Sequence, residues 1–202
     1  MKLARIANLI FVTFLFFSCQ RSEFGGRALM SVPEIKLEDW KLQVFYHSKK
    51  LCEFSFDDLA KLPRATAYTC LVRYEDKSGA CGTFEGVRIE DVVKTCGAPD
   101  NSERLVFIGA DSYETSLDIG EMKGDWLIAF KVNGRDLAKD EGYPARAVIP
   151  GRYDYKWVRW LSKIVLIKGE HYGYWELLGR DNSGVVPKYI FRSVEHSSKS
   201  SR

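Results

Sequence analysis

The chain has 202 residues, of which 46% are hydrophobic and 13% aromatic. A chain of this length can bury a substantial core, and its length favours one domain rather than two. Its 30 basic and 27 acidic residues leave a formal net charge of only +3, whereas proteins that bind nucleic acids usually carry a basic excess over the whole domain. The composition therefore predicts a single globular domain and excludes nucleic acid as a main partner.

The N-terminus has the features of a targeting segment. Lys2 and Arg5 form a short positive region, and the apolar run LIFVTFLFFSC that ends at Cys19 is too short to span a bilayer comfortably. The end of this run is similar to a bacterial lipoprotein cleavage box, which implies a signal peptide over residues 1–18, a lipidated Cys19 and a tether over residues 19–38. We expect an exported protein anchored by lipid to a bacterial membrane, on the periplasmic side or at the cell surface. An uncleaved membrane anchor is the alternative.

Four cysteines follow in the remainder of the chain. An exported protein meets conditions that permit disulfides, and an even number of cysteines is typical of pairing, with three connectivities open. No spacing matches a zinc pattern. The four residues are Cys52, Cys70, Cys81 and Cys96.

The first half of the chain alternates strand and helix patterns. Residues 40–63 predict two strands joined by a turn at Lys49-Lys50, then a short helix that is capped by Ser55 and stopped by Pro63. Residues 82–99 predict a strand flanked by glycines and a helix that ends before a Gly-Ala-Pro sequence.

Apolar strand patterns dominate the second half. Residues 104–111 and 125–137 are apolar runs, and the second turns at Asn133-Gly134, a strong hairpin signal. Residues 145–150 and 163–169 predict two further strands.

Strands outnumber helices in this pattern, and the helices are short. The sequence therefore predicts an α+β domain, with a mixed sheet and short helices, over residues 39–192. The polar end of the chain, which includes HSSKSSR, predicts a disordered tail over residues 193–202.

The turn between the last two strands is both basic and aromatic. Because the positive charge is concentrated here, the turn predicts a local site for an anion. The alternative is a buried aromatic stripe with helix-like spacing, Trp157, Val158, Trp160 and Leu161, under a solvated charged face. The basic residues are Arg152, Lys156, Arg159 and Lys163, interleaved with Tyr153, Tyr155, Trp157 and Trp160.

An ordered set of motifs resembles the molybdopterin-binding domain of the sulfite oxidase family. The segments FEGVRIEDVV, GADSYETSLDI and GYWELLGR belong to this set. The most specific part lies between Asp125 and Lys168, where NG-x-x-L, Gly-x-Pro-x-Arg, Val-Ile-Pro-Gly and Lys-Trp-Val-x-Trp-Leu occur in the family's order. The resemblance covers about Phe54 to Arg180 and implies the family's fold.

The resemblance also implies a cofactor, a molybdopterin with a phosphate. Arginine and lysine suit the phosphate, and an aromatic face suits the pterin ring. Pro150-Gly151 would let the backbone approach the cofactor closely. For Arg159 and Trp160 the buried, structural interpretation is preferred. The residues that the resemblance places at the pterin cleft are Arg146, Arg152, Lys156 and Trp157.

Molybdenum in this family is held by one cysteine thiolate, a soft ligand. The resemblance assigns this role to Cys70, with Arg73 as part of the cofactor site and Tyr113 as a catalytic candidate near the metal. Tyr113 fits an ordinary half-buried strand residue equally well. The family's usual tryptophan after the cysteine is replaced here by Tyr74, and DSY replaces the common DGY.

Two features favour a cofactor-free protein instead. Cys81 lies close enough in sequence to form a disulfide with Cys70, which would remove the metal ligand. The N-terminal MKLARIAN lacks the arginine pair of the export route that family members carrying the cofactor generally use.

Three functions follow from these observations. The first is a molybdopterin-dependent oxidoreductase that transfers an oxygen atom to or from sulfur in a small molecule or sulfoxide. It would need a separate electron-transfer partner, because the chain has no C-x-x-C-H haem motif. The second is a cofactor-free binding or structural lipoprotein with the same fold. The third is a general binder of anionic ligands.

Overall fold

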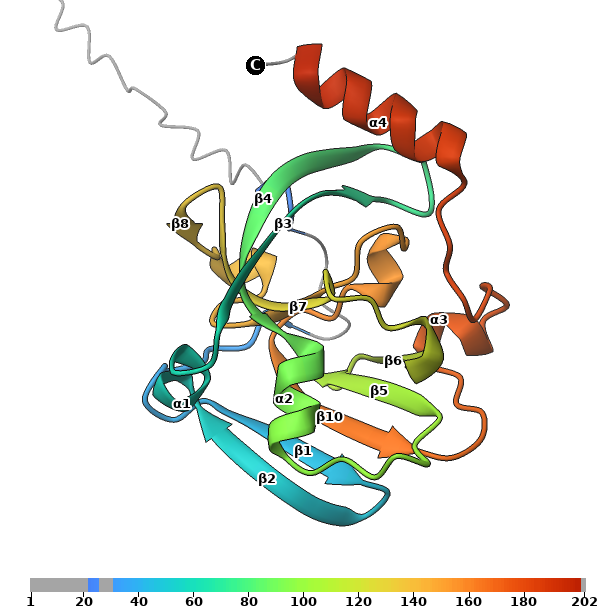
Figure 1. The fold of residues 1–202 in the computed structure, drawn as a ribbon. Coiled ribbons are helices and arrows are strands. Elements are labelled where there is room, and N and C mark those ends of the chain that lie inside the picture. Colours follow the sequence, from blue (N-terminus) through green and yellow to red (C-terminus); the bar gives the residue numbers. More distant parts are fainter. Residues whose placement is uncertain (1–21, 26–30, 201–202) are drawn as a thin grey trace, which may run out of the picture.

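The structure is a computed structural model that describes residues 22–25 and 31–200. Its strands form two five-stranded sheets, one in the order β2-β1-β10-β5-β6 and one in the order β3-β4-β7-β8 with β9 paired to β7 (Figure 1). The expected signal peptide and Cys19 lie outside the described residues. Within the described residues, no helix is long and apolar enough to cross a membrane.

The first sheet is mixed, as the sequence predicts. The first strand runs parallel to the last, whereas the other pairs are antiparallel. Segments far apart in the sequence therefore share a ladder, which requires tertiary folding to bring them together. The strands are β1 (Lys41–Tyr46), β2 (Lys49–Ser55), β5 (Arg104–Gly109), β6 (Glu114–Asp118) and β10 (Leu161–Ile167).

The second sheet is antiparallel throughout. Its longest pairing joins β3 to β4 over nine registered residue pairs, and this pairing carries Cys70 and Cys81. The strands are β3 (Arg64–Val72), β4 (Gly79–Arg88), β7 (Leu127–Val132), β8 (Arg135–Asp136) and β9 (Arg146–Val148).

The helices are short apart from the last. Ser55 caps α1, with its side chain accepting the Asp58 N–H, so the predicted cap is confirmed. The α-helices are α1 (Phe56–Ala60), α2 (Ile89–Thr95), α3 (Tyr174–Leu177) and α4 (Lys188–Ser200), and the 3-10 turns are η1 (Ile119–Glu121), η2 (Lys139–Glu141) and η3 (Asp154–Lys156).

The two predicted hairpin turns differ in outcome. Asn133 and Gly134 both adopt positive φ and join β7 to β8, as predicted. The turn expected at Lys49-Lys50 falls instead at His47-Ser48, so that both lysines belong to β2. His47 takes a φ of 50° and its N–H donates to the Leu166 carbonyl, a contact with a neighbouring strand that local sequence does not encode.

Residues 193–200 are helical rather than a disordered tail. They belong to α4, which lies beside the β3–β4 hairpin (Figure 1) and contacts both strands. Ile190 and Val194 are buried on its inner face. Most of the helix surface is exposed, which explains the polar composition of the tail. Two apolar residues four positions apart are enough to pack the helix against the hairpin.

The aromatic turn is buried but is not a helical stripe. Trp157, Trp160 and Leu161 are buried, as expected for core residues. However, the helical turn η3 ends before Trp157, and β10 begins at Leu161. The main core cluster contains residues of both sheets and of α2, including Val44, Phe84, Val92, Phe107, Ile128 and Ile164.

Candidate functional site

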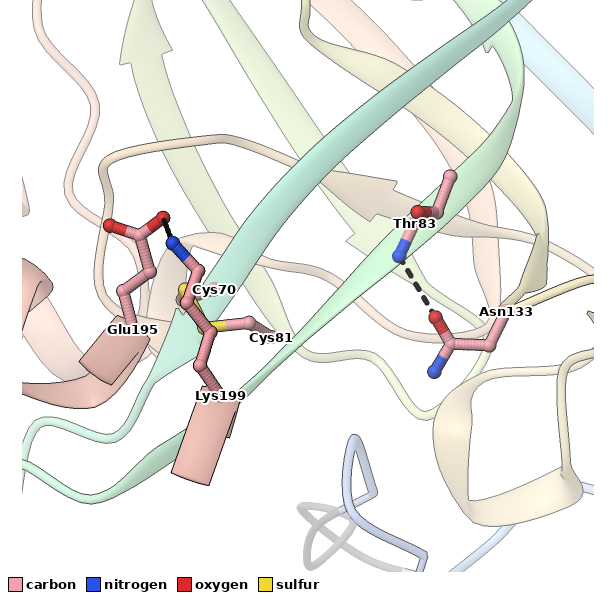
Figure 2. Close-up of a disulfide and its surroundings, with 6 residues drawn as sticks. All are labelled: Cys70, Cys81, Thr83, Asn133, Glu195 and Lys199. Carbon is pink, nitrogen blue, oxygen red and sulfur yellow. Dashed lines mark hydrogen bonds and ion pairs between the residues drawn. A yellow bond between two sulfur atoms is a disulfide. The ribbon is translucent and has the colours of Figure 1, made fainter. Parts of the chain in front are cut away.

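Cys70 is bonded to Cys81 in this structure (Figure 2). The two residues lie directly opposite each other on β3 and β4, with their Cα atoms 3.9 Å apart, and their sulfur atoms form a disulfide. Cys70 is 1% exposed and Cys81 is 3% exposed. Because its sulfur is part of a disulfide, Cys70 presents no thiolate to a metal.

The disulfide lies in a small second core cluster that α4 covers. Val72, Ile190 and Val194 pack in this cluster together with Tyr153 and Tyr155. On α4, Lys199 and Glu195 form an ion pair of 3.0 Å close to the disulfide in Figure 2. The helix that was missed in the sequence therefore helps to bury the predicted metal ligand.

Three tyrosine rings next to the disulfide pack against one another, and two cations of the chain lie over them. Tyr74 meets Tyr153 and Tyr155 edge-on, at centroid distances of 5.1 and 5.6 Å. The Arg180 guanidinium lies 4.6 Å from the Tyr74 ring centroid, and the Lys77 ammonium lies 4.1 Å from it. The faces and edges of these rings are therefore already in contact with one another and with the protein's own cations.

Tyr113 reaches this group through its hydroxyl, which donates to the backbone carbonyl of Tyr155. Burial raises the pKa of Tyr113 well above its ordinary value, and the charges of Glu176 and Asp154 raise it further. The Tyr155 hydroxyl donates to the Asp181 carbonyl at 2.8 Å, and burial raises its pKa as well. Both phenols are therefore protonated hydrogen-bond donors at neutral pH, already engaged with backbone.

Lys156 is fully enclosed and paired. Its ammonium donates to the Ser116 carbonyl at 2.9 Å and forms a buried ion pair with Glu176, which also accepts from Thr115. Burial lowers the pKa of Lys156, while the Glu176 charge opposes that shift. This lysine has no exposed surface, and its charge is already paired with a carboxylate. It therefore has no free charge with which to bind a phosphate.

The Arg152 guanidinium is also bonded to groups of its own chain. One nitrogen donates to the Ser183 carbonyl at 2.8 Å and another to the Glu121 carboxylate at 2.9 Å. Its backbone carbonyl accepts the Trp157 indole N–H at 3.1 Å. Arg152, Lys156 and Trp157 thus meet in one turn, as the sequence predicts, but their polar groups hold that turn to its neighbours.

Arg146 lies on β9 and is 1% exposed. It donates to the Phe24 carbonyl at 2.9 Å and stands 5.6 Å from the Trp157 ring centroid, while its Nε has no partner within the described part of the chain. Burial lowers the pKa of Arg146 to about 9, and the nearby Arg159 acts in the same direction.

Arg73 also binds the N-terminal segment. It donates to the Glu23 carbonyl at 3.1 Å, one residue before the carbonyl that Arg146 holds. Two cations assigned to the cofactor on the resemblance are thus brought together, and both contact residues 23–24. From the sequence this segment is expected to be only a tether; its one signal is an aromatic residue followed by two glycines in a polar stretch.

A second disulfide was not predicted as a pair. Cys52 of β2 is bonded to Cys96, the residue that ends α2, over a sequence separation of 44. The sequence left three connectivities open, and only the positions of β2 and α2 in space select this one.

Comparison with known proteins shows the family. The model of the oxidoreductase molybdopterin binding domain matches residues 29–175, and the chain belongs to this family. It is 25% identical to mitochondrial sulfite oxidase of Drosophila melanogaster and 29% identical to that of Homo sapiens, with 86% and 87% of this chain covered. These alignments span only 35% and 37% of the relatives.

Two further matches have different coverage. The uncharacterized oxidoreductase YuiH of Bacillus subtilis is 27% identical, with 69% of this chain and 71% of that protein covered. The structure of the sulfane dehydrogenase SoxCD from Paracoccus pantotrophus superposes with a TM-score of 0.62 at 24% identity, over 69% of this chain and 41% of that chain. This likeness shows that the fold is of the sulfite oxidase type.

The residues that the resemblance assigns to the cofactor do not fit it in this structure. The sulfur of Cys70 is bonded to Cys81, Lys156 is enclosed with Glu176, and Arg152 is held by Glu121. Arg73 and Arg146 bind backbone carbonyls of the N-terminal segment. A molybdopterin needs a free thiolate and cations that can bind its phosphate; in this structure Cys70 presents no thiolate, and the cations at these positions are already bonded to the chain's own groups.

Proposed function

We propose that this chain is an exported lipoprotein that uses the molybdopterin-binding fold without molybdenum, as a binding or structural protein. The observation that carries the proposal is the Cys70–Cys81 disulfide, which removes the thiolate that molybdenum would require. Fold alone does not determine function, and the site decides it. General binding of anions through Arg152 and Lys156 is disfavoured because each already forms an ion pair, with Glu121 and Glu176 respectively.

Export and lipid anchoring are part of the same proposal. Four cysteines arranged in two disulfides support an oxidising compartment. The apolar run that ends at Cys19 supports a lipoprotein signal peptide. We expect mass spectrometry of the membrane fraction to identify a mature chain that begins with a lipid-modified Cys19. Recovery of intact residues 1–18 would contradict this part.

A second candidate is the oxygen-atom transfer chemistry of an oxidoreductase, acting on sulfur in a small molecule or sulfoxide with a separate electron-transfer partner. The family match favours it, as does the place of Cys70 on β3 within the cluster that also contains Tyr155, whose carbonyl accepts the Tyr113 hydroxyl. This candidate requires a chain in which the Cys70–Cys81 disulfide is reduced, because molybdenum binds a thiolate.

One experiment separates the two candidates. Protein purified from its native host is analysed for molybdenum by elemental mass spectrometry and for cysteine pairing by peptide mapping without reduction. The proposal predicts no molybdenum and a Cys70–Cys81 linked peptide. About one molybdenum per chain, with Cys70 in the thiol form, would establish the second candidate instead.

A pair of matched variants sharpens that result. Cys81→Ser frees the Cys70 thiol, whereas Cys96→Ser breaks the other disulfide and leaves Cys70 bonded. The proposal predicts no molybdenum in either variant. The second candidate predicts molybdenum in Cys81→Ser at a level at least equal to the wild type, and loss of molybdenum in Cys70→Ser.

A further inference from the structure

We infer that the side chains of Arg73, Phe84, Asp140 and Arg146 form a peptide-binding site, and that its ligand in this chain is the chain's own segment Ser22–Gly25. We call this segment the strap and the four residues the strap site. The inference concerns a ligand that the proposed function leaves unnamed. It does not depend on lipid attachment.

Two arginines recognise the backbone of the strap. Arg73 donates to the Glu23 carbonyl at 3.1 Å, and Arg146 donates to the Phe24 carbonyl at 2.9 Å. Hydrogen bonds from a charged donor are stronger than neutral ones, and Arg146 makes its bond away from water. Consecutive carbonyls held by two cations are the contacts expected for a bound peptide rather than for a loose tether.

Phe84 and Gly82 contact the aromatic residue of the strap. Phe24 is 1% exposed and meets the Phe84 ring edge-on, with centroids 5.2 Å apart and planes at 77°. A Cβ added to Gly82 would come within 2.8 Å of the Phe24 ring, so the glycine keeps this space open. Burying this ring removes apolar surface from water and so favours the attached strap.

Asp140 holds the beginning of the strap. Its carboxylate accepts the Ser22 N–H at 3.1 Å and the Ser22 hydroxyl at 3.0 Å. The strap then turns, with the Gly25 N–H donating to the Ser22 carbonyl at 3.1 Å. A Cβ on Gly25 would lie 2.2 Å from the Asp140 carboxylate, so a larger residue here requires that carboxylate to move away from its contacts with Ser22.

These contacts define the class of ligand. The site fits a short segment with a hydroxyl residue, then a variable residue, an aromatic residue and a glycine, and it reads two carbonyls in between. Because the strap is covalently attached, its effective concentration is high and it excludes the same segment in free solution. The strap also covers Arg146, whose guanidinium donates to the Phe24 carbonyl.

The test releases the strap from the full chain and offers the same segment in trans. Gly25→Val introduces a side chain where a Cβ alone would overlap Asp140, while Gly124→Val places the same side chain where the nearest atom is 4.0 Å away. A fluorescent peptide with the sequence QRSEFGGR is titrated into each protein, and binding is followed by anisotropy. We expect binding to Gly25→Val and none to the wild type or Gly124→Val.

Two controls test specificity. The peptide QRSEAGGR, which lacks the aromatic ring, should bind at least about tenfold more weakly, because burying a ring is worth more than 1.4 kcal/mol. The peptide QRAEFGGR, which lacks the hydroxyl that Asp140 accepts from the strap, should likewise bind Gly25→Val about tenfold more weakly than QRSEFGGR. Equal binding of both peptides, or no binding to a folded Gly25→Val protein, would overturn the inference.

A measurement without any added peptide covers the case in which Gly25→Val does not fold. Chymotrypsin cleaves after phenylalanine, and Phe24 is buried only while the strap is bound. Cleavage after Phe24 should be slow in the wild type and about tenfold faster in Asp140→Ala. Equally fast cleavage in both would refute the bound strap. Neither readout depends on molybdenum, so metal in the native protein would refute the proposed function and leave this test unaffected.

Discussion

The two disulfides of this domain differ in what they connect. Cys52–Cys96 joins β2 to the end of α2 across a separation of 44 residues, and both cysteines are half-buried. Cys70–Cys81 joins directly opposite residues of two strands that are already hydrogen-bonded, across 11 residues, and both are buried under α4. The first crosslink constrains distant parts of the chain; the second adds a bond to an existing ladder.

Loop entropy makes this difference quantitative. Closing a loop of 44 residues lowers the entropy of the unfolded chain, which raises the free energy of unfolding by about 4 kcal/mol at 25 °C. Closing a loop of 11 residues raises it by about 3 kcal/mol. The second disulfide is therefore expected to contribute less to the free energy of unfolding. Its larger consequence is chemical, because it engages the one cysteine that the family resemblance assigns to molybdenum.

The largest effect is expected from removing the long crosslink. The double variant Cys52→Ser/Cys96→Ser should lose about 4 kcal/mol of unfolding free energy, measured by urea denaturation without reductant. Replacing both cysteines avoids a free thiol. A loss below that of the other pair would break the comparison between the two disulfides.

The double variant Cys70→Ser/Cys81→Ser should lose about 3 kcal/mol in the same assay. It should remain folded, with an unchanged far-ultraviolet circular dichroism spectrum, because the β3–β4 ladder does not need the crosslink. A loss well above that of Cys52→Ser/Cys96→Ser would mean that packing around the sulfur atoms, rather than loop closure, dominates.

The cover over the second disulfide should control its reduction. Ile190 of α4 packs in the cluster around Cys70, and Ile190→Ala should weaken that packing by about 2 kcal/mol, or a factor of about 30 in local opening. Dithiothreitol should then reduce Cys70–Cys81 faster, with Cys52–Cys96 unaffected. Ser193→Ala, on the exposed side of α4, is the matched control; an equal acceleration there would contradict a covering role.

The smallest predicted effect concerns alkaline pH. The folded-state pKa of Tyr155, beside the second disulfide, is raised above the unfolded value of about 10, mainly by burial. Its stabilising contribution is complete below pH 10 and is lost as pH rises through the folded pKa, because the unfolded chain releases the proton first.

Tyr155→Phe should therefore reduce the loss of stability between pH 9 and pH 11 by about 1 kcal/mol relative to the wild type. Urea unfolding at the two pH values measures this difference, and Tyr68→Phe on the exposed surface of β3 is the control. An unchanged pH dependence in Tyr155→Phe would show that the phenol ionises in the folded chain.

Local signals in the sequence predicted local structure well. The Ser55 cap and the Asn133-Gly134 hairpin depend on hydrogen bonds and backbone angles within a few residues, and both are confirmed. The position of the first hairpin turn was wrong because His47 bonds to Leu166, far away in the chain. The helix α4 was missed because a polar segment reveals little of its packing when only a few apolar residues touch the domain.

By itself, the sequence determined the α+β class, the family and the set of candidate residues, because motif order and apolar periodicity depend only on the order of residues along the chain. The tertiary structure alone decided what those residues do. It paired Cys70 with Cys81, enclosed Lys156 with Glu176, and set Arg73 and Arg146 on carbonyls of the strap. Bonds and ion pairs form between groups that are close in space, and that proximity exists only once the sheets and their covering segments have folded together.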